Sequence, residues 1–206
     1  DRRAPASAAQ GRLVQTLDGA SIWRWRHLAD GTSVADDEAA RLTTDAEGRV
    51  QMVWRDGSER VYCHNQAGEL ESLRRDGECV ARCRYDHKGR LVWKSGAGGC
   101  ERYLYGADDS LLAVADGEGR PKWIWLRDPT GLVGAIDFRH DPRGEALVLH
   151  RDPFGNVIAI GRADGSLHRC AGFDPWGLPL GEAASLLPPI WRGRLWHADI
   201  GAYAFG

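Results

Sequence analysis

The chain has 206 residues, with 27 basic and 29 acidic side chains and a net charge of −2. This is enough chain for one substantial domain, and the charge balance excludes electrostatic steering toward nucleic acid or an anionic membrane. No run approaches the roughly 18 apolar residues of a membrane-spanning helix. Glycine occurs 26 times, tryptophan nine times and methionine once, a balance that favours strands and turns over helices.

Two segments near the start differ from the rest. Residues 1–11 are rich in Ala, Arg and Ser without periodicity, which predicts a loose arm or, alternatively, an extended arm that adds a strand to an open sheet edge. Residues 33–42 are the one stretch whose composition indicates a short helix. We expect residues 12–206 to form a single domain.

From residue 12 onward, turn signals recur about every ten residues. Most are an Asp or Asn followed by Gly, either directly or three residues later. The segments between them are short, and several alternate apolar and polar residues, which is typical of half-buried strands. Examples are residues 49–55, 90–94, 122–126 and 156–160. The pattern predicts an all-β fold of short strands, either an antiparallel meander or a parallel winding sheet.

Four of these turns share the pattern Asp-Pro-x-Gly. In a type I turn the Asp carboxylate accepts local backbone N–H groups, Pro presets φ, and Gly tolerates the exit geometry. We therefore expect a structural role for Asp128, Pro129 and Gly131, for Asp141, Pro142 and Gly144, for Asp152, Pro153 and Gly155, and for Asp174, Pro175 and Gly177.

A longer repeat is superimposed on the turns. Shifting the chain against itself by 20 to 22 residues aligns residues 45–50, 65–70 and 86–91, so that each repeat comprises two strands and two turns. A single hairpin cannot bury its apolar face alone, whereas stacked repeats build a continuous sheet whose open ends need capping. A fragment of such an array exposes strand edges.

One repeat has a distinctive sequence. Residues 84–91 read Arg-Tyr-Asp-His-Lys-Gly-Arg-Leu and resemble the Tyr-Asp-x-x-Gly-Arg-Leu signature of the bacterial RHS and YD-repeat family. The segments over residues 103–131 and 173–206 follow the order seen at the C-terminal end of an RHS core. Besides the Asp-Pro-x-Gly turns, the positions that carry the resemblance are Tyr85, Asp86, Gly89, Arg90, Leu91, Gly193, Arg194, Gly201 and Tyr203.

The chain departs from the family pattern near residue 200. Residues 200–203 read Ile-Gly-Ala-Tyr in place of Thr-Gly-Leu-Tyr, and the family's Arg-Tyr-Tyr-Asp segment, final self-cleaving motif and toxin are not found. We therefore expect no toxin in this chain. Asp174 has the spacing of the self-cleaving motif, but its position before Gly193 and Arg194 matches an ordinary core turn. We predict a structural turn there and no autoproteolysis.

The resemblance implies a β-sheet that, in complete family members, spirals into a hollow shell around a cargo polypeptide. We accordingly expect a non-enzymatic structural module that forms part of a shell wall or of a bacterial secreted or cell-surface assembly. Filaments are one expected outcome, because exposed sheet edges can pair between chains. One alternative is a shell that delivers a separate effector, and another is a surface module that binds glycans through exposed tryptophans.

We expect structural roles for the cysteines, histidines and tryptophans. No Cys-x-x-Cys pair occurs, which argues against a zinc or haem site. Cys79 and Cys100 occupy equivalent places in adjacent repeats, but equivalent strands of a meander lie beyond the usual Cα span of a disulfide, so we expect buried free thiols, with a Cys79–Cys100 bridge as the alternative. No nucleophile motif accompanies the histidines, so we expect no catalytic residue, cofactor or metal. The tryptophans are expected to pack inward. The cysteines are Cys63, Cys79, Cys83, Cys100 and Cys170, and the histidines near carboxylates are His64, His140, His150, His168 and His197.

Overall fold

The computed structural model describes residues 15–18, 21–27, 33–35, 40–44, 50–54, 57, 59–170, 172–173, 179, 187–192 and 194–203. Every regular element in these ranges is a β-strand, which confirms the predicted all-β class. No helix that could cross a membrane occurs among these residues. The chain divides into two compact units, residues 1–80 and 81–206. Residues 1–11 lie outside the described ranges, and the single domain over residues 12–206 stays a prediction.

The first unit is an antiparallel ladder of hairpins, in which each strand pairs with the next one in the chain. The short helix predicted over residues 33–42 is wrong, because Ser33 lies opposite Leu42 and Val34 opposite Arg41. Cross-strand pairing overrides a weak local preference for helix here. The strands are β1 (Gln15–Asp18), β2 (Ser21–His27), β3 (Ser33–Ala35), β4 (Ala40–Thr44), β5 (Val50–Trp54), β6 (Glu59–His64) and β7 (Leu70–Arg75).

The second unit begins within β8 and continues as the same kind of ladder. Each of its strands pairs antiparallel with its neighbours in the chain, which selects the meander over the parallel winding sheet. The strands are β8 (Glu78–Tyr85), β9 (Leu91–Gly96), β10 (Gly99–Tyr105), β11 (Leu111–Asp116), β12 (Pro121–Asp128), β13 (Gly131–Asp137), β14 (Glu145–Arg151), β15 (Val157–Arg162) and β16 (Leu167–Arg169).

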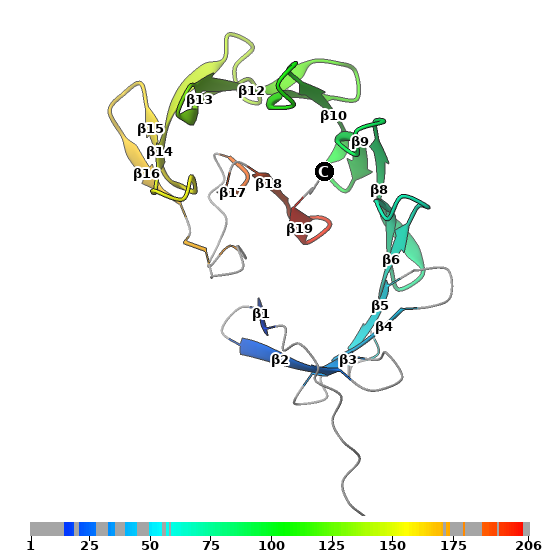
Figure 1. Cartoon of the computed structure of the whole chain (residues 1–206). Helices are drawn as coiled ribbons and strands as arrows, with labels where there is room; N and C mark the ends of the chain where they lie inside the picture. The colour runs from blue at the N-terminus through cyan, green and yellow to red at the C-terminus, as the bar shows by residue number, and fades with distance from the viewer. Residues whose placement is uncertain are drawn as a thin grey trace, which may run out of the picture. The chain divides into compact units, whose positions relative to one another are not determined.

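The C-terminal segment, defined here as residues 187–192 and 194–203, forms a separate three-stranded sheet. Its strands are β17 (Ile190–Trp191), β18 (Arg194–His197) and β19 (Ala202–Tyr203). Strands β9–β16, coloured green to yellow, curve around these orange to red strands (Figure 1). We call the face of the β9–β16 sheet that meets the C-terminal segment the inner face, and the opposite side the outer face.

Burial alternates between the two faces along a strand. On β14, Leu147 is 2% exposed, Val148 57% and Leu149 6%, as expected when successive side chains point to opposite sides of a sheet. The core of the second unit lies between the inner face and the C-terminal segment. The inner face contributes Val114, Trp123, Trp125, Ala135, Leu147 and Ile160, and the C-terminal segment contributes Leu187, Ile190, Leu195 and Ile200.

Asp-x-x-Gly turns close the hairpins. The Gly89 N–H donates to the Asp86 carbonyl, and the Gly155 N–H to the Asp152 carbonyl, both at 3.0 Å. Both glycines have a positive φ, 77° and 84°, which glycine adopts without the clash of a Cβ. The Asp side chain adds a second restraint, because Asp86 Oδ1 accepts the N–H groups of Lys88 and Arg90. The turn is thus specified at both its first and last residues.

Candidate functional site

The Tyr-Asp repeat forms a tightly bonded hairpin end. Arg90 donates from Nε and Nη2 to Asp86 Oδ2 at 2.8 and 2.5 Å, and from Nη1 to Asp109 Oδ1 at 2.6 Å. Its guanidinium carbon lies 4.8 Å from the centre of the Tyr105 ring. The hydrogen bond from Arg90 lowers the pKa of Asp86 to about 2. Asp86 and Arg90 therefore close one turn and connect it to the next turn along the sheet edge.

The other residues of the motif continue this structural arrangement. Tyr85 lies opposite Leu91, which is buried and whose carbonyl accepts the Tyr105 hydroxyl at 2.9 Å. Within the C-terminal segment, the Gly201 N–H donates to the His197 carbonyl at 2.7 Å, and the buried Tyr203 packs against Trp196 at 5.0 Å between ring centres. These contacts fix the ends of the strands.

Two of the Asp-Pro-x-Gly turns, those that begin at Asp128 and Asp152, are linked across the sheet edge. The Thr130 N–H and hydroxyl both donate to Asp128 Oδ1, at 2.7 and 2.6 Å, and the Arg151 guanidinium donates to the Thr130 carbonyl at 3.0 Å. Arg151 directly precedes the Asp152 turn, so the two turns are joined. Four predicted residues lie outside the described ranges, namely Asp174, Pro175, Gly177 and Gly193.

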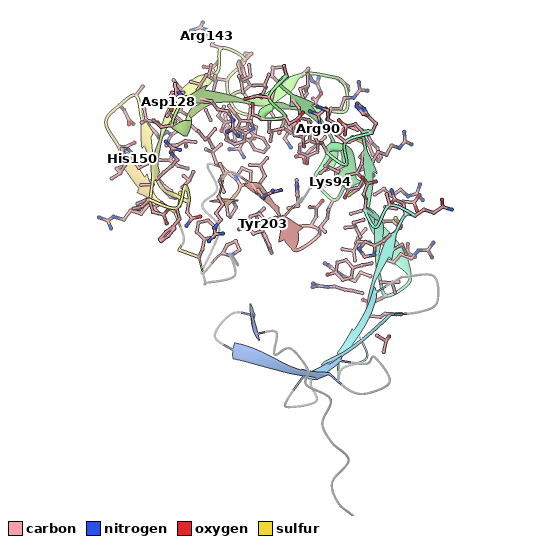
Figure 2. The ribbon with its side chains drawn as sticks, in the orientation of Figure 1. Arg90, Lys94, Asp128, Arg143, His150 and Tyr203 are labelled. Atoms are coloured by element: carbon pink, nitrogen blue, oxygen red, sulfur yellow. The ribbon has the colours of Figure 1, made fainter. Side chains whose placement is uncertain are left out.

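Six ionisable side chains meet between the inner face and the C-terminal segment. We call them the inner polar cluster: Lys94, Glu101, Tyr103, Lys122, His197 and Asp199. Lys94 Nζ lies 2.8 Å from Asp199 Oδ1 and 3.4 Å from Glu101 Oε2. Glu101 also pairs with Lys122 and accepts the Tyr103 hydroxyl at 2.6 Å. Lys94, labelled in Figure 2, is only 7% exposed.

Tyr103 and His197 complete the cluster through their rings. The Tyr103 oxygen lies 3.5 Å from His197 Nδ1, and the two rings meet edge to face at 5.6 Å between centres. Tyr103 belongs to β10 and His197 to β18, so this contact, like the Lys94–Asp199 pair, joins segments about a hundred residues apart. The cluster therefore attaches the C-terminal segment to the sheet.

Burial and pairing determine the protonation of the cluster. Burial raises the pKa of Glu101, but hydrogen bonds from Lys122 and Tyr103 outweigh it, and the resulting pKa is about 2. Burial lowers the pKa of His197 to about 4, so the imidazole is neutral at pH 7. Burial, followed by the charge of Glu101, raises the pKa of Tyr103, which keeps its phenol protonated and able to donate.

This electrostatic arrangement pairs opposite charges across the two segments. At pH 7 two ammonium groups, Lys94 and Lys122, face two carboxylates, Glu101 and Asp199. Neither His197 nor Tyr103 exchanges protons near neutrality, whereas general acid–base catalysis needs a pKa close to the working pH. The nearby Cys83 thiol has a pKa raised to about 11 by burial, so it is not an activated nucleophile.

Metal binding receives no support from the described ranges. In them, no three His, Cys, Asp or Glu side chains come together as possible metal ligands. No disulfide joins the five cysteines, all of which are described, and the Cys79–Cys100 bridge does not form. The expectation that the thiols are buried holds only for Cys83, because Cys79 and Cys100 are exposed and the other two are intermediate.

Most of the inner polar cluster is not recognisable from the sequence. Lys94, Glu101, Lys122 and Asp199 were not singled out, and His197 was assigned a structural or surface role without a partner. The signal that was available is the Lys at the end of the apolar run in residues 91–94, since a lysine that shares a strand with buried residues needs a carboxylate partner. Its partner Asp199 lies 105 residues away, a distance over which local pattern carries no information.

The four tryptophans whose side chains the structure describes offer no exposed platform for sugars. Trp123 and Trp125 are buried and stacked at 6.3 Å between ring centres, and Trp93 and Trp196 are half-buried. The Trp123 ring is flanked by the cations of Lys122 and Arg139, at 4.9 and 4.8 Å from its centre. This geometry agrees with the prediction of inward packing for Trp123 and Trp125. Comparison with protein-family models and with curated proteins finds no match for the chain.

Proposed function

We propose that the chain is a non-enzymatic structural module whose curved β-sheet acts as a wall that encloses polypeptide on its inner face. The observation that carries this proposal is the seating of the chain's own C-terminal segment on that face. The attachment includes an ion pair between Lys94 and Asp199 and the ring contact between Tyr103 and His197. A wall that covers polypeptide is also what the resemblance to the RHS and YD-repeat family implies.

A third contact supports the same proposal at the other end of the sheet. The buried Asn156 accepts the backbone N–H of Arg192 with its Oδ1 at 3.0 Å, and its amide donates to Asp152 Oδ2 at 2.7 Å. Asn156 therefore connects an Asp-Pro-x-Gly turn of the sheet to the C-terminal segment. Contacts at β9–β10 and after the β14–β15 turn hold the segment at two separated places, as a covering wall requires.

The last strand of the β8–β16 ladder supports assembly with further chains. All three residues of β16 are exposed, with Leu167 at 57%, and β15 is the one strand that pairs with β16 among the described residues. Such an edge presents backbone groups to a strand of another chain. We propose that the module takes part in a bacterial secreted or cell-surface assembly, with a filament as one form and a shell around a separate effector as the alternative.

Limited proteolysis tests the enclosing wall directly. In the full chain, trypsin should cleave after Arg194, inside the C-terminal segment, about tenfold more slowly than after Arg143 at an exposed turn. Asp199→Asn should raise the cleavage rate after Arg194 and leave that after Arg143 unchanged, while Asp164→Asn at an exposed turn serves as the matched control. Equal cleavage of both sites in the unchanged chain would contradict the proposal.

The assembly state is tested by light scattering together with negative-stain electron microscopy of the purified chain. Fibres or large regular particles are expected if the β16 edge pairs with another chain. A Leu167→Lys substitution places a charge on that edge strand and should reduce the particle mass. A monodisperse monomer at all concentrations would remove the filament from the proposal and leave the wall.

A further inference from the structure

Two rows of apolar residues cross the outer face of the β9–β16 sheet. Strand pairing places the members of each row side by side on successive strands, on the side away from buried neighbours such as Tyr103 and Leu147. The first row is Leu104, Ala113, Ile124, Ile136 and Ala146, and the second is Leu126, Gly134, Val148, Gly161 and Leu167. Leu104 is 50% exposed, and Val148 and Leu167 are 57% exposed. A contiguous apolar patch of this kind marks an interaction surface on a folded protein.

Two further rows of the same face flank the apolar rows and contain arginines. Their members also lie opposite one another on adjacent strands. They are Arg84, Trp93 and Arg102 on β8–β10, beside Leu104, and His150, Ala159 and Arg169 on β14–β16, beside Val148. None of the four rows contains Asp or Glu. The carboxylates of the hairpin turns lie at the strand ends, outside these rows, and Asp128, for example, bonds to Thr130 of its own turn.

The three arginines of the flanking rows have donors left for a ligand. Arg84, Arg102 and Arg169 are exposed, and none of them forms an ion pair or a side-chain hydrogen bond with a residue that the structure describes. Arg84 does lie over the Trp93 ring, with its guanidinium carbon 4.9 Å from the ring centre. That contact uses the face of the guanidinium and leaves the N–H groups in its plane for an acceptor. The flanking rows therefore present positive charge that no carboxylate of the described residues neutralises.

This distribution of charge selects an anionic partner. The net charge of −2 argues against an anionic membrane when the chain is considered as a whole, whereas the only charged side chains of the four rows are arginines. A second copy of the chain fits poorly, because pressing the apolar rows of two copies together would bring arginines against arginines. We propose that the outer face binds an anionic phospholipid surface, with the aliphatic side chains at the acyl-chain boundary and the arginines on the phosphate groups. This inference goes beyond the proposed wall, since it uses the face opposite the enclosed polypeptide.

The shape and composition of the face favour a lipid surface over an acidic protein. The strands curve around the C-terminal segment, so the outer face is convex (Figure 1). Its apolar rows are aliphatic and lack the aromatic anchors that dominate protein interfaces and fill a partner's pockets. Trp93, half-buried between Arg84 and Arg102, lies beside the apolar rows, as Trp does at the headgroup level of a membrane. Guanidinium groups bind phosphate through paired donors, and this attraction adds to apolar burial.

Co-sedimentation of the full chain with lipid vesicles tests the proposal. Vesicles of phosphatidylglycerol and phosphatidylcholine in equal parts should bind about tenfold or more tightly than pure phosphatidylcholine vesicles, and added salt should weaken the binding. Arg102→Glu should lose about tenfold in affinity, whereas its matched control Arg102→Lys keeps the charge and the binding. Leu126→Ser/Val148→Ser should also lose about tenfold, and the matched Leu126→Met/Val148→Ile should bind like the unchanged chain. Circular dichroism of each variant verifies that the fold is kept.

Four results would overturn the proposal. Two are the absence of vesicle binding and equal affinities for each variant and its matched control. The third is a dimer, formed without vesicles and unable to bind them, that Leu126→Ser/Val148→Ser dissociates, which would assign the face to a second copy. The fourth is binding of polyglutamate, but not of vesicles, that requires Arg102, which would assign the face to an acidic protein. Trypsin protection of Arg194 tests the proposed wall separately, so either proposal can fail without the other.

Discussion

Each face of the second unit carries some side chains that depart from the usual relation between polarity and burial. The inner face carries Lys94, Glu101 and Asp137, which are shielded from water. The outer face carries a row of apolar side chains that are exposed to water. Paired residues of β12–β16 form this row, in which Leu126, Val148 and Leu167 are 41%, 57% and 57% exposed. Antiparallel sheets more commonly show the opposite arrangement.

This difference shows that side chains on this sheet are buried where the C-terminal segment covers them, whatever their polarity. The C-terminal segment covers the inner face, so each charge there must be paired: Lys94 with Asp199 and Asp137 with Arg139 at 2.7 Å. The outer row consists of apolar side chains, so it contains no charged group that would need such a partner. The following experiments test this contrast.

The largest effect is expected for Lys94→Met. Removing the ammonium leaves Asp199 without its ion-pair partner and Glu101 with one cation fewer in a shielded site, which should lower the free energy of unfolding by about 4 kcal/mol. Lys88→Met is the matched control, since Lys88 pairs with Asp109 on an exposed turn and should cost less than about 1 kcal/mol. Urea denaturation measures both values, and similar losses would show that the cluster does not support the fold.

Shortening the side chains of two adjacent residues of β14 compares the stability that each face contributes. Leu147→Ala removes a buried side chain from the inner face and should cost about 3 kcal/mol, whereas Val148→Ala on the outer face should change stability by less than about 0.5 kcal/mol. Thermal and urea unfolding of the two variants provide the comparison. A loss for Val148→Ala as large as that for Leu147→Ala would mean that another surface covers the outer face.

Acid should destabilise the inner face in a defined pH window. Because the pKa of His197 is lowered from 6.5 to about 4, the unfolded chain binds a proton more readily, and stability should fall as the pH drops from 6.5 toward 4. The loss should reach about 3 kcal/mol. Glu101, with its pKa near 2, extends the loss below pH 4.5.

His197→Gln tests the assignment of that window. The variant should lose the pH dependence between 6.5 and 4 and keep the part below 4.5 that comes from Glu101. Urea midpoints measured at pH 7, 5.5 and 4 separate the two contributions. An unchanged slope between pH 6.5 and 4 in His197→Gln would assign the effect to another group.

The smallest effect is expected from substitutions in the two turns at opposite ends of β15. Asp152 accepts the N–H groups of Phe154 and Asn156 and the Asn156 amide, so Asp152→Ala should cost about 1 to 2 kcal/mol. Asp164 accepts the Ser166 N–H at an exposed turn, and Asp164→Ala should lower the stability less than Asp152→Ala does. If the two losses are equal, the Asn156 link to the C-terminal segment adds nothing to stability.

Local sequence predicted the hairpin ladder well because its determinants are local. Asp86 and Gly89 specify a turn within four residues, and period-two alternation identifies the residues that share a face, such as Leu147 and Leu149. The helix predicted over residues 33–42 failed because strand pairing decided the outcome. The choice between meander and parallel winding was also open, since both use the same turn spacing.

The sequence could not indicate which face is covered or by what. That depends on contacts such as Lys94–Asp199 and Tyr103–His197, whose partners are about a hundred residues apart. A second reason is that nothing in the sequence around Asn156 distinguishes it from other residues that follow a turn, although its side chain accepts the backbone N–H of Arg192. The side chains of the inner polar cluster become recognisable only when the two segments are brought together.

The sheet and the C-terminal segment that covers it are far apart in the sequence, and this has a consequence during synthesis on the ribosome. Every pairing in the β8–β16 ladder joins neighbours in the chain, so the ladder can form while translation continues. Asp199 emerges 105 residues after Lys94, which corresponds to about 5 to 20 seconds. During that interval the inner face is open to water, and the residues that finally exclude water from it are made after all the strands that they cover.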